Sequence, residues 1–132
     1  CTINMTPCDY NDPNAYFRGV IDTLELSDVV AQVGDWKTGK KGEYDNQLSF
    51  YTMLVLVNFP NIKSVLTRIR YLDLGSSTPG IEYKRRDLDA LFTNWVSCSK
   101  RMERDKIRSP TPGIHCIWCP YNAKKMGLCK WN

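Results

Sequence analysis

The chain has 132 residues, of which 42% are hydrophobic and 24% charged, as is typical of a single globular domain. A chain of this length can bury roughly two thirds of the surface of its unfolded form. No apolar run approaches the roughly 18 residues of a membrane span, so we expect no membrane span within these residues. Lys and Arg exceed Asp and Glu by 18 to 14, and this net charge of +4 fits an anionic partner without requiring one.

The N-terminal part of the chain predicts a loop followed by two strands. Residues 1–15 are rich in Asn, Asp, Pro and Thr and indicate an irregular segment. Residues 16–25 alternate in polarity and carry aromatic and β-branched side chains, which predicts a strand. Residues 29–38 begin with a continuous apolar run and predict a second strand. Since only residues 26–28 separate them, the two strands should be antiparallel.

The rest of the chain predicts two helices that alternate with further strands. The apolar run at 50–57 is suited to a helix buried against a sheet, and Pro60 closes that helix. Asp87 is suited to cap the second helix. We expect, in order, a basic loop at 38–42, a helix at 44–58, a strand at 63–75, a turn at 76–80, a strand at 81–84, a helix at 87–105 and a linker at 108–113.

The element order β-β-α-β-β-α predicts an α/β fold with a mixed central sheet and a helix that crosses between strands. We expect one domain over residues 1–132, with a cysteine-rich tail at 109–132 within it. The sequence shows no secretion signal, which favours the cytoplasm, or the host cytoplasm for a phage-encoded protein.

Carboxylates are expected where the first two strands end. Asp22 closes the sequence GVID, and Asp35 lies in GDWKTG with Lys37 two residues later. Residues two apart on a strand point to the same side, so Asp35 and Lys37 should share a face. Two carboxylates, together with water and substrate oxygens, are a usual ligand set for Mg²⁺. A lysine beside them can stabilise charge that develops on a phosphate.

The motifs GVID, GDWKTG and QLSFY, which together span residues 17–51, resemble the PD-(D/E)XK nucleases of the RecB-like branch. The resemblance implies a restriction-endonuclease-like core and Mg²⁺- or Mn²⁺-dependent hydrolysis of DNA. It implies that Asp22, Asp35 and the backbone carbonyl of Trp36 bind the metal ion and that Lys37 acts on the nucleophilic water or the phosphate. Gln47 and Tyr51 match the motif on the following helix, where they contact DNA or position the lysine.

The resembling nucleases usually carry a helix before GVID with a His or Glu that completes the metal site. Residues 1–15 show no such helix, and the only histidine is His115. Two interpretations follow: an upstream helix completes the site, or Asp22 and Asp35 bind the metal with water alone.

The tail predicts a metal site. Cys116 and Cys119 form a CxxC pair, and Cys129 can fold back to the same metal ion. The resemblance implies a [4Fe-4S] cluster held by these three and an earlier cysteine, for which Cys8 is our candidate; Cys1, His115 and an upstream residue are alternatives. Zinc is the alternative metal, and a disulfide framework remains the alternative for a secreted protein.

The basic residues indicate how DNA is bound. Lys40 and Lys41 follow the catalytic strand and are the best candidates for phosphate contacts, so binding should be largely independent of sequence. The resemblance implies an exonuclease of recombination, repair or phage replication, with a helicase or recombination partner; an oligomer is compatible with processive members. The alternative is a metal-stapled DNA-binding module whose nuclease site is incomplete.

Overall fold

The computed structural model describes residues 1–42, 44–107, 111–122 and 129. The chain divides into two compact units, Cys1–Lys100 and Arg101–Asn132, and each is considered by itself. The first unit contains the sheet and nearly all helical residues, whereas the second contains the 3-10 helix η2 (Ile114–Trp118). The arrangement of residues 1–132 as one domain with a tail at 109–132 stays a prediction. In the described part of the chain, no helix has the length and apolar character to cross a membrane.

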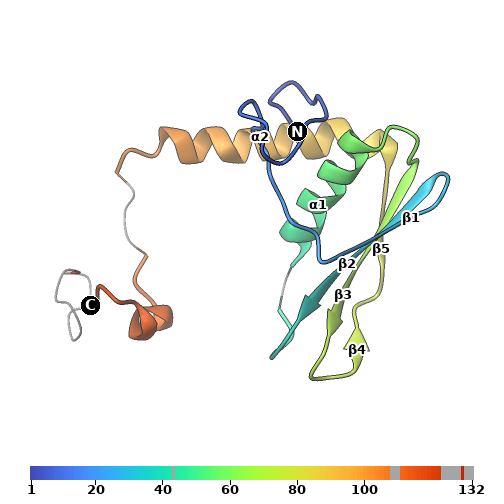
Figure 1. Ribbon diagram of the computed structural model, residues 1–132. Coiled ribbons are helices and arrows are strands. Elements are labelled where there is room, and N and C mark those ends of the chain that lie inside the picture. Colours follow the sequence, from blue (N-terminus) through green and yellow to red (C-terminus); the bar gives the residue numbers. More distant parts are fainter. Residues whose placement is uncertain (43, 108–110, 123–128, 130–132) are drawn as a thin grey trace. The chain divides into compact units, whose positions relative to one another are not determined.

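The first unit is built on a five-stranded sheet (Figure 1), and the predicted mixed character of this sheet is confirmed. The outer strand β1 pairs antiparallel with β2, which pairs parallel with β3. Both β4 and β5 pair antiparallel with β3, at different positions along it. The strand bounds are Thr23–Leu26 for β1, Val30–Lys37 for β2, Ser64–Tyr71 for β3, Ser76–Ser77 for β4 and Ile81–Lys84 for β5.

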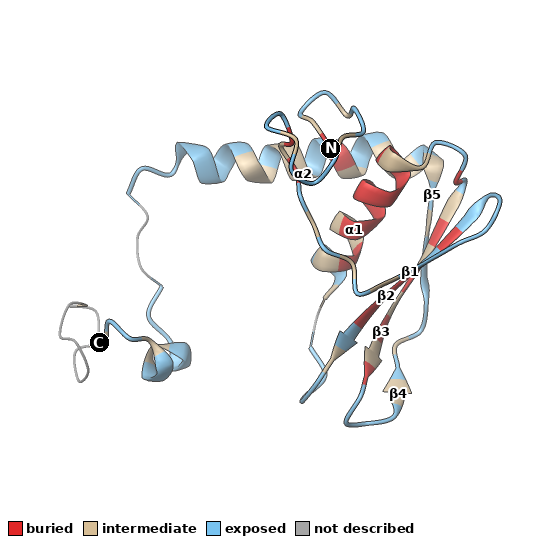
Figure 2. Cartoon of the chain, in the orientation of Figure 1, coloured by how far each residue is buried: buried red, intermediate tan, exposed pale blue. Residues whose placement is uncertain are grey.

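Helix α1 (Asp45–Asn58) makes the crossover between the parallel strands β2 and β3. Parallel neighbours cannot be joined by a tight turn, so a helix must return the chain to the start of the sheet. The helix is apolar around most of its circumference after Leu48, because one side packs on the sheet and another on helix α2 (Leu88–Arg104). Figure 2 shows α1 as the most continuously buried helix of the unit.

Strand β3 confirms the predicted alternation. Val65, Thr67, Ile69 and Tyr71 are buried on the α1 side, whereas the residues between them are only partly covered. The strand ends at Tyr71, and Ser76–Ser77 forms the short strand β4 where the sequence predicted only a turn.

The predicted strand at residues 16–25 is wrong in its first part. Only Thr23–Leu26 pairs with β2, and no described residue before Thr23 belongs to a strand or helix. The aromatic signal has another cause: Phe17 is 6% exposed because its ring packs edge-on against Phe50 and Phe92 of the two helices. Asp22 therefore precedes a strand instead of ending one. The irregular segment predicted for residues 1–15 is confirmed.

Helix α2 begins at Leu88, directly after the predicted cap residue Asp87, and follows the 3-10 turn η1 (Arg85–Asp87). The Asp87 carboxylate accepts a hydrogen bond from the N–H of Lys84, 2.8 Å away, at the start of η1. The helix packs on α1 through Phe92, with Trp95 partly buried beside it.

Arg85 closes the C-terminal end of α1. Its guanidinium donates to the carbonyl oxygens of Leu56 (3.1 Å) and Phe59 (2.6 Å), and its Nε donates to that of Ile62. The last carbonyls of a helix have no partner within the helix. A cation there is also attracted by the partial negative charge at the C-terminal end of the helix dipole. Arg85 thus connects the end of the crossover helix to the start of α2.

We expect Arg85→Ala to lower the free energy of unfolding by about 3 kcal/mol, because several buried carbonyls lose a charged donor at once. Arg85→Lys should recover only part of this loss, since an ammonium lacks the planar fork of donors. Urea unfolding followed by circular dichroism measures both. Arg86→Ala is the matched control because the Arg86 side chain is 79% exposed, and it should change stability by less than about 0.5 kcal/mol. An equal effect at both positions would contradict this role.

Candidate active site

The site is centred on Asp35, a carboxylate that the sheet and α1 enclose. It lies near the end of β2 on the side that faces α1 and is 1% exposed. Its Oδ1 accepts a hydrogen bond of 2.8 Å from Nε2 of Gln47. Its Oδ2 lies 2.6 Å from Nζ of Lys37, with which it forms an ion pair. A buried carboxylate is costly unless it is paired, so these two contacts are what permit its burial.

Lys37 lies on the same face of β2 as Asp35, as the two-residue spacing predicts. The hydrogen bond to Asp35 raises the pKa of Lys37 above its ordinary value of 10.5, while partial burial opposes the shift. Lys37 is therefore a cation at neutral pH and can supply positive charge, but not a free amine base. Nζ also lies 5.0 Å from the centre of the Tyr44 ring. Tyr44 was not predicted as a site residue, since nothing in its sequence context marks it.

Helix α1 contributes one polar face to the site. Gln47 and Tyr51 are one turn apart, and Nε2 of Gln47 donates to the hydroxyl of Tyr51 at 2.9 Å as well as to Asp35. The predicted common face of this pair is confirmed. The Gln47 amide thus links the crossover helix to the carboxylate on β2 at the point where the helix begins.

Asp22 reaches the same end of β2 from the adjacent segment. Its Oδ2 accepts the N–H of Trp36, 2.9 Å away, so this carboxylate lies at the peptide that joins Asp35 to Trp36. Asp22 is exposed, and the described residues thus leave it open to solvent.

The backbone carbonyl of Trp36 faces the edge at which Asp22 lies. The carbonyl of Lys37 accepts from the N–H of Leu72 and so faces β3. Successive peptide groups of a strand alternate in direction, so both polar groups of Trp36 face the opposite edge. Strand β1 pairs with β2 only as far as Thr23 and Gly34, which leaves this carbonyl beyond the ladder.

These oxygen donors fit a hard divalent cation. Asp22, Asp35 and the Trp36 carbonyl would hold Mg²⁺ or Mn²⁺, with water and substrate oxygens as the other ligands. The described residues contain no group of three or more His, Cys, Asp or Glu side chains around one point. The donor set thus suits an ion that keeps several waters, rather than one enclosed by protein. It can place a metal-bound phosphate beside the Lys37 cation.

The basic loop that follows β2 is attached to the end of β3. Gly39 has a φ of +85°, which favours glycine, and its N–H donates to Asp73 at 2.6 Å. The N–H of Gly42 donates to the hydroxyl of Tyr71 at 3.3 Å. These anchors leave Lys40 and Lys41 exposed. The sequence pattern placed Tyr71 on the buried face of β3 but gave no sign that it and Asp73 hold this loop.

Within the described part of the chain, the predicted cysteine ligands do not belong to any group of three or more His, Cys, Asp or Glu side chains. Cys116, Cys119 and Cys129 belong to the second unit and are partly buried, and Cys8 belongs to the first. The N–H of Cys119 donates to the carbonyl oxygen of Cys116, and that of Cys129 donates to the carbonyl oxygen of Tyr121. Sγ of Cys116 accepts a hydrogen bond of 3.3 Å from the N–H of Gly113. All six cysteines fall within the described residues, and none forms a disulfide bond. The metal ligand set therefore stays a prediction.

A parallel βαβ crossover, with a carboxylate and a lysine on its first strand and a second carboxylate beside it, is typical of nucleases that use a metal ion. The model of the PD-(D/E)XK nuclease superfamily matches residues 3–124. The chain belongs to this superfamily, whose members hydrolyse phosphodiester bonds. Searches of curated proteins and of solved structures returned no match.

The Asp35–Lys37 pair gives a testable stability effect. We expect Lys37→Met to lower the free energy of unfolding at pH 7 by about 2–3 kcal/mol, because a buried carboxylate loses its cation. The variant Lys37→Met/Asp35→Asn should recover part of the loss, since neither charge is then buried. Urea unfolding of the wild type, both single variants and the double variant measures the coupling.

The same pair predicts a pH dependence. Because the folded-state pKa of Lys37 is raised, its stabilising contribution is complete below about pH 10.5 and is lost as the pH rises through the folded value. The stability difference between wild type and Lys37→Met should therefore shrink only in that alkaline range. A difference that already disappears near pH 8 would contradict the assignment.

Proposed function

We propose that this protein is a metal-dependent deoxyribonuclease that acts as an exonuclease. The observation that carries the proposal is the pairing of buried Asp35 with Lys37 and Gln47, beside the exposed carboxylate of Asp22. Family membership supports phosphodiester hydrolysis. The choice of DNA and of attack from strand ends rests on the resemblance of GVID, GDWKTG and QLSFY to RecB-like members.

Each site residue has a role in the proposal. Asp22, Asp35 and the Trp36 carbonyl hold Mg²⁺ or Mn²⁺, which neutralises the scissile phosphate and lowers the pKa of the attacking water. Lys37, kept as a cation by Asp35, stabilises the charge that develops on the phosphate. Gln47 fixes one oxygen of Asp35 so that the other stays directed at Lys37 and the metal. Tyr51 holds the Gln47 amide in that orientation.

Lys40 and Lys41 contact phosphates of the bound DNA in this proposal. Both are exposed on a loop whose ends are anchored at Asp73 and Tyr71, so the charges are presented from a defined position next to the catalytic strand. Contacts of this kind position the backbone and carry little sequence information. Binding of DNA should accordingly be largely independent of sequence.

The proposal extends to the tail and to the cellular setting. We propose that Cys116, Cys119 and Cys129 with Cys8 hold a [4Fe-4S] cluster, with Zn²⁺ as the alternative, in a structural role. The resemblance supports a process in recombination, repair or phage replication in the cytoplasm, with a helicase or recombination partner. An oligomer is compatible with this function.

The second candidate function is a DNA-binding module stabilised by metal whose nuclease site is inactive. The absence of a third acidic or histidine ligand beside Asp22 and Asp35 among the described residues is the observation that favours it.

We expect the wild type to digest end-labelled linear DNA with Mg²⁺ or Mn²⁺ and to leave circular DNA intact. Lys37→Ala should lower the rate by about 10²-fold or more, the usual cost of removing one charge-stabilising group. Lys63→Ala is the matched control, because this exposed lysine precedes β3 at the other end of the sheet, and it should cut at the wild-type rate. A folded wild type that binds DNA but does not cut it favours the binding module. Digestion of circles would contradict the exonuclease.

We expect protein purified without oxygen to contain iron and acid-labile sulfide, measured by elemental and colorimetric analysis. Cys116→Ser, Cys119→Ser, Cys129→Ser and Cys8→Ser should each lower the iron content, because each removes a thiolate ligand. Cys98→Ser is the control, since Cys98 lies on α2 and is not among the proposed ligands. Zinc without sulfide would support the alternative metal. Protein that contains neither iron nor zinc would overturn the proposed cluster.

A further inference from the structure

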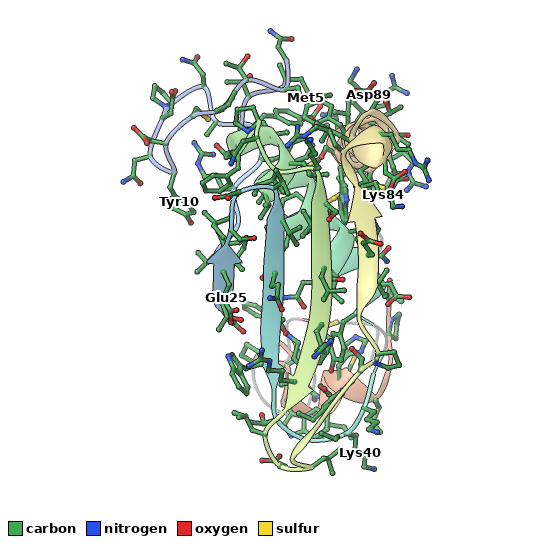
Figure 3. The ribbon with its side chains drawn as sticks, turned by 90° about the vertical axis from the view of Figure 1, so that its right-hand side faces the viewer. Met5, Tyr10, Glu25, Lys40, Lys84 and Asp89 are labelled. Atoms are coloured by element: carbon green, nitrogen blue, oxygen red, sulfur yellow. The ribbon has the colours of Figure 1, made fainter. Side chains whose placement is uncertain are left out.

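The face of the sheet opposite α1 is not covered by a helix among the described residues of the first unit. Figure 3 looks onto this face, where side chains lie in front of β2 and β3. Trp36, Arg68 and Arg70 project from it, since they alternate with the buried residues that face α1. Trp36 is 39% exposed although its peptide belongs to the catalytic site.

Trp36 and Arg70 are direct neighbours on the parallel strands β2 and β3. The guanidinium carbon of Arg70 lies 5.1 Å from the centre of the indole ring, within the range of a cation–π contact. An indole held in this way is a flat, oriented surface on which a planar ring can stack, and base stacking on aromatic side chains needs no particular base.

The charges of Arg68 and Arg70 are not neutralised by an acidic side chain of the described residues. Neither Arg68 nor Arg70 forms an ion pair with a described residue. Nε of Arg68 and Oγ of Ser76 are both buried without a hydrogen-bond partner in the described part of the chain. A buried donor without a partner is costly, so such a group calls for water, an ion or a ligand to satisfy it. These two atoms, beside the guanidinium of Arg70, fit an anion with several acceptor oxygens.

These groups line one cleft of about 340 Å³, which Trp36, Arg68, Arg70 and Ser76 share with Leu72 and Ser77. Its volume falls in the range of pockets that take small ligands, about 300–1,000 Å³. The cleft therefore combines a stacking surface, two guanidinium groups and serine hydroxyls. A nucleotide has a planar base and a phosphate and matches this combination.

We propose that this cleft binds one unpaired nucleotide of a DNA strand, with its base on the Trp36 indole and its phosphate between Arg68, Arg70 and Ser76. The inference rests on DNA being the partner, as in the proposed function, but uses the other face of β2. An unpaired base is required because the bases of a duplex are already stacked on one another. The cleft would therefore give the protein a preference for single-stranded DNA or for a frayed end.

The first test is binding of a fluorescein-labelled oligo-dT strand, measured by anisotropy in metal-free buffer so that no cutting occurs. We expect Trp36→Leu to weaken binding about tenfold and Trp36→Phe to weaken it less than about threefold, because only Phe keeps a ring for stacking. Arg68→Ala/Arg70→Ala should reduce the slope of log K against log salt by about 1–2, as expected for lost phosphate contacts. Arg86→Ala removes an exposed arginine outside the cleft and is the control.

An abasic strand separates the two parts of the cleft. With it, Trp36→Leu should bind as the wild type does, whereas the arginine variant should still bind more weakly. Circular dichroism and thermal unfolding of each variant show whether it is folded. If the folded Trp36→Leu and arginine variants both bind oligo-dT as Arg86→Ala does, the cleft does not bind nucleic acid and the inference is overturned.

The outcome is distinguishable from that of the proposed function. Normal binding by the cleft variants, together with Mg²⁺-dependent cutting that Lys37→Ala abolishes, would overturn the cleft and leave the nuclease. Loss of binding in the cleft variants, with no cutting by the wild type, would support the cleft and overturn the nuclease.

Discussion

The burial of the Asp35 carboxylate is the constraint on which the rest of the site depends. A carboxylate that is 1% exposed needs a cation and a hydrogen-bond donor within the protein. Lys37 meets the first need from the same strand, and Gln47 meets the second from the start of α1. The helix that carries Gln47 must therefore pass over the end of β2. It does so because α1 is the crossover between β2 and β3, which pair in parallel.

At the end of β2, Trp36 contributes its peptide to the candidate site and its indole to the open face of the sheet. The peptide of Trp36 is held by Asp22 at the edge where the proposed metal ligands lie, while its indole lies against Arg70 on the open face. Alternation along a strand makes this unavoidable: if Asp35 and Lys37 face the helix, the residue between them faces away. The identity of that residue then decides what the far face can bind, and tryptophan beside arginine suits a nucleotide.

The loop after β2 shows how contacts with β3 and the residues after it hold two exposed lysines, Lys40 and Lys41, in a defined position. Gly39 takes a positive φ that lets the chain leave the strand. Asp73 then accepts the N–H of Gly39, and the hydroxyl of Tyr71 accepts the N–H of Gly42. Nζ of Lys41 lies 6.0 Å from the centre of the Tyr71 ring. The basic loop is thus fixed to the end of β3, the strand that also completes the crossover.

Much of this could be predicted from the sequence, because it depends on local spacing. The alternation of β3, the buried helix α1, the shared face of Asp35 with Lys37 and the one-turn spacing of Gln47 and Tyr51 all follow from the periods of strand and helix. The segment at 16–22 was misjudged because the ring of Phe17 packs between helices that are distant in sequence. What only the tertiary structure decided were contacts between such distant segments: Asp22 on the Trp36 peptide, Arg85 at the end of α1, the anchors of the basic loop, and the open face where Arg70 lies against Trp36. No local period encodes these contacts, since they depend on how the strands are ordered and which face α1 covers.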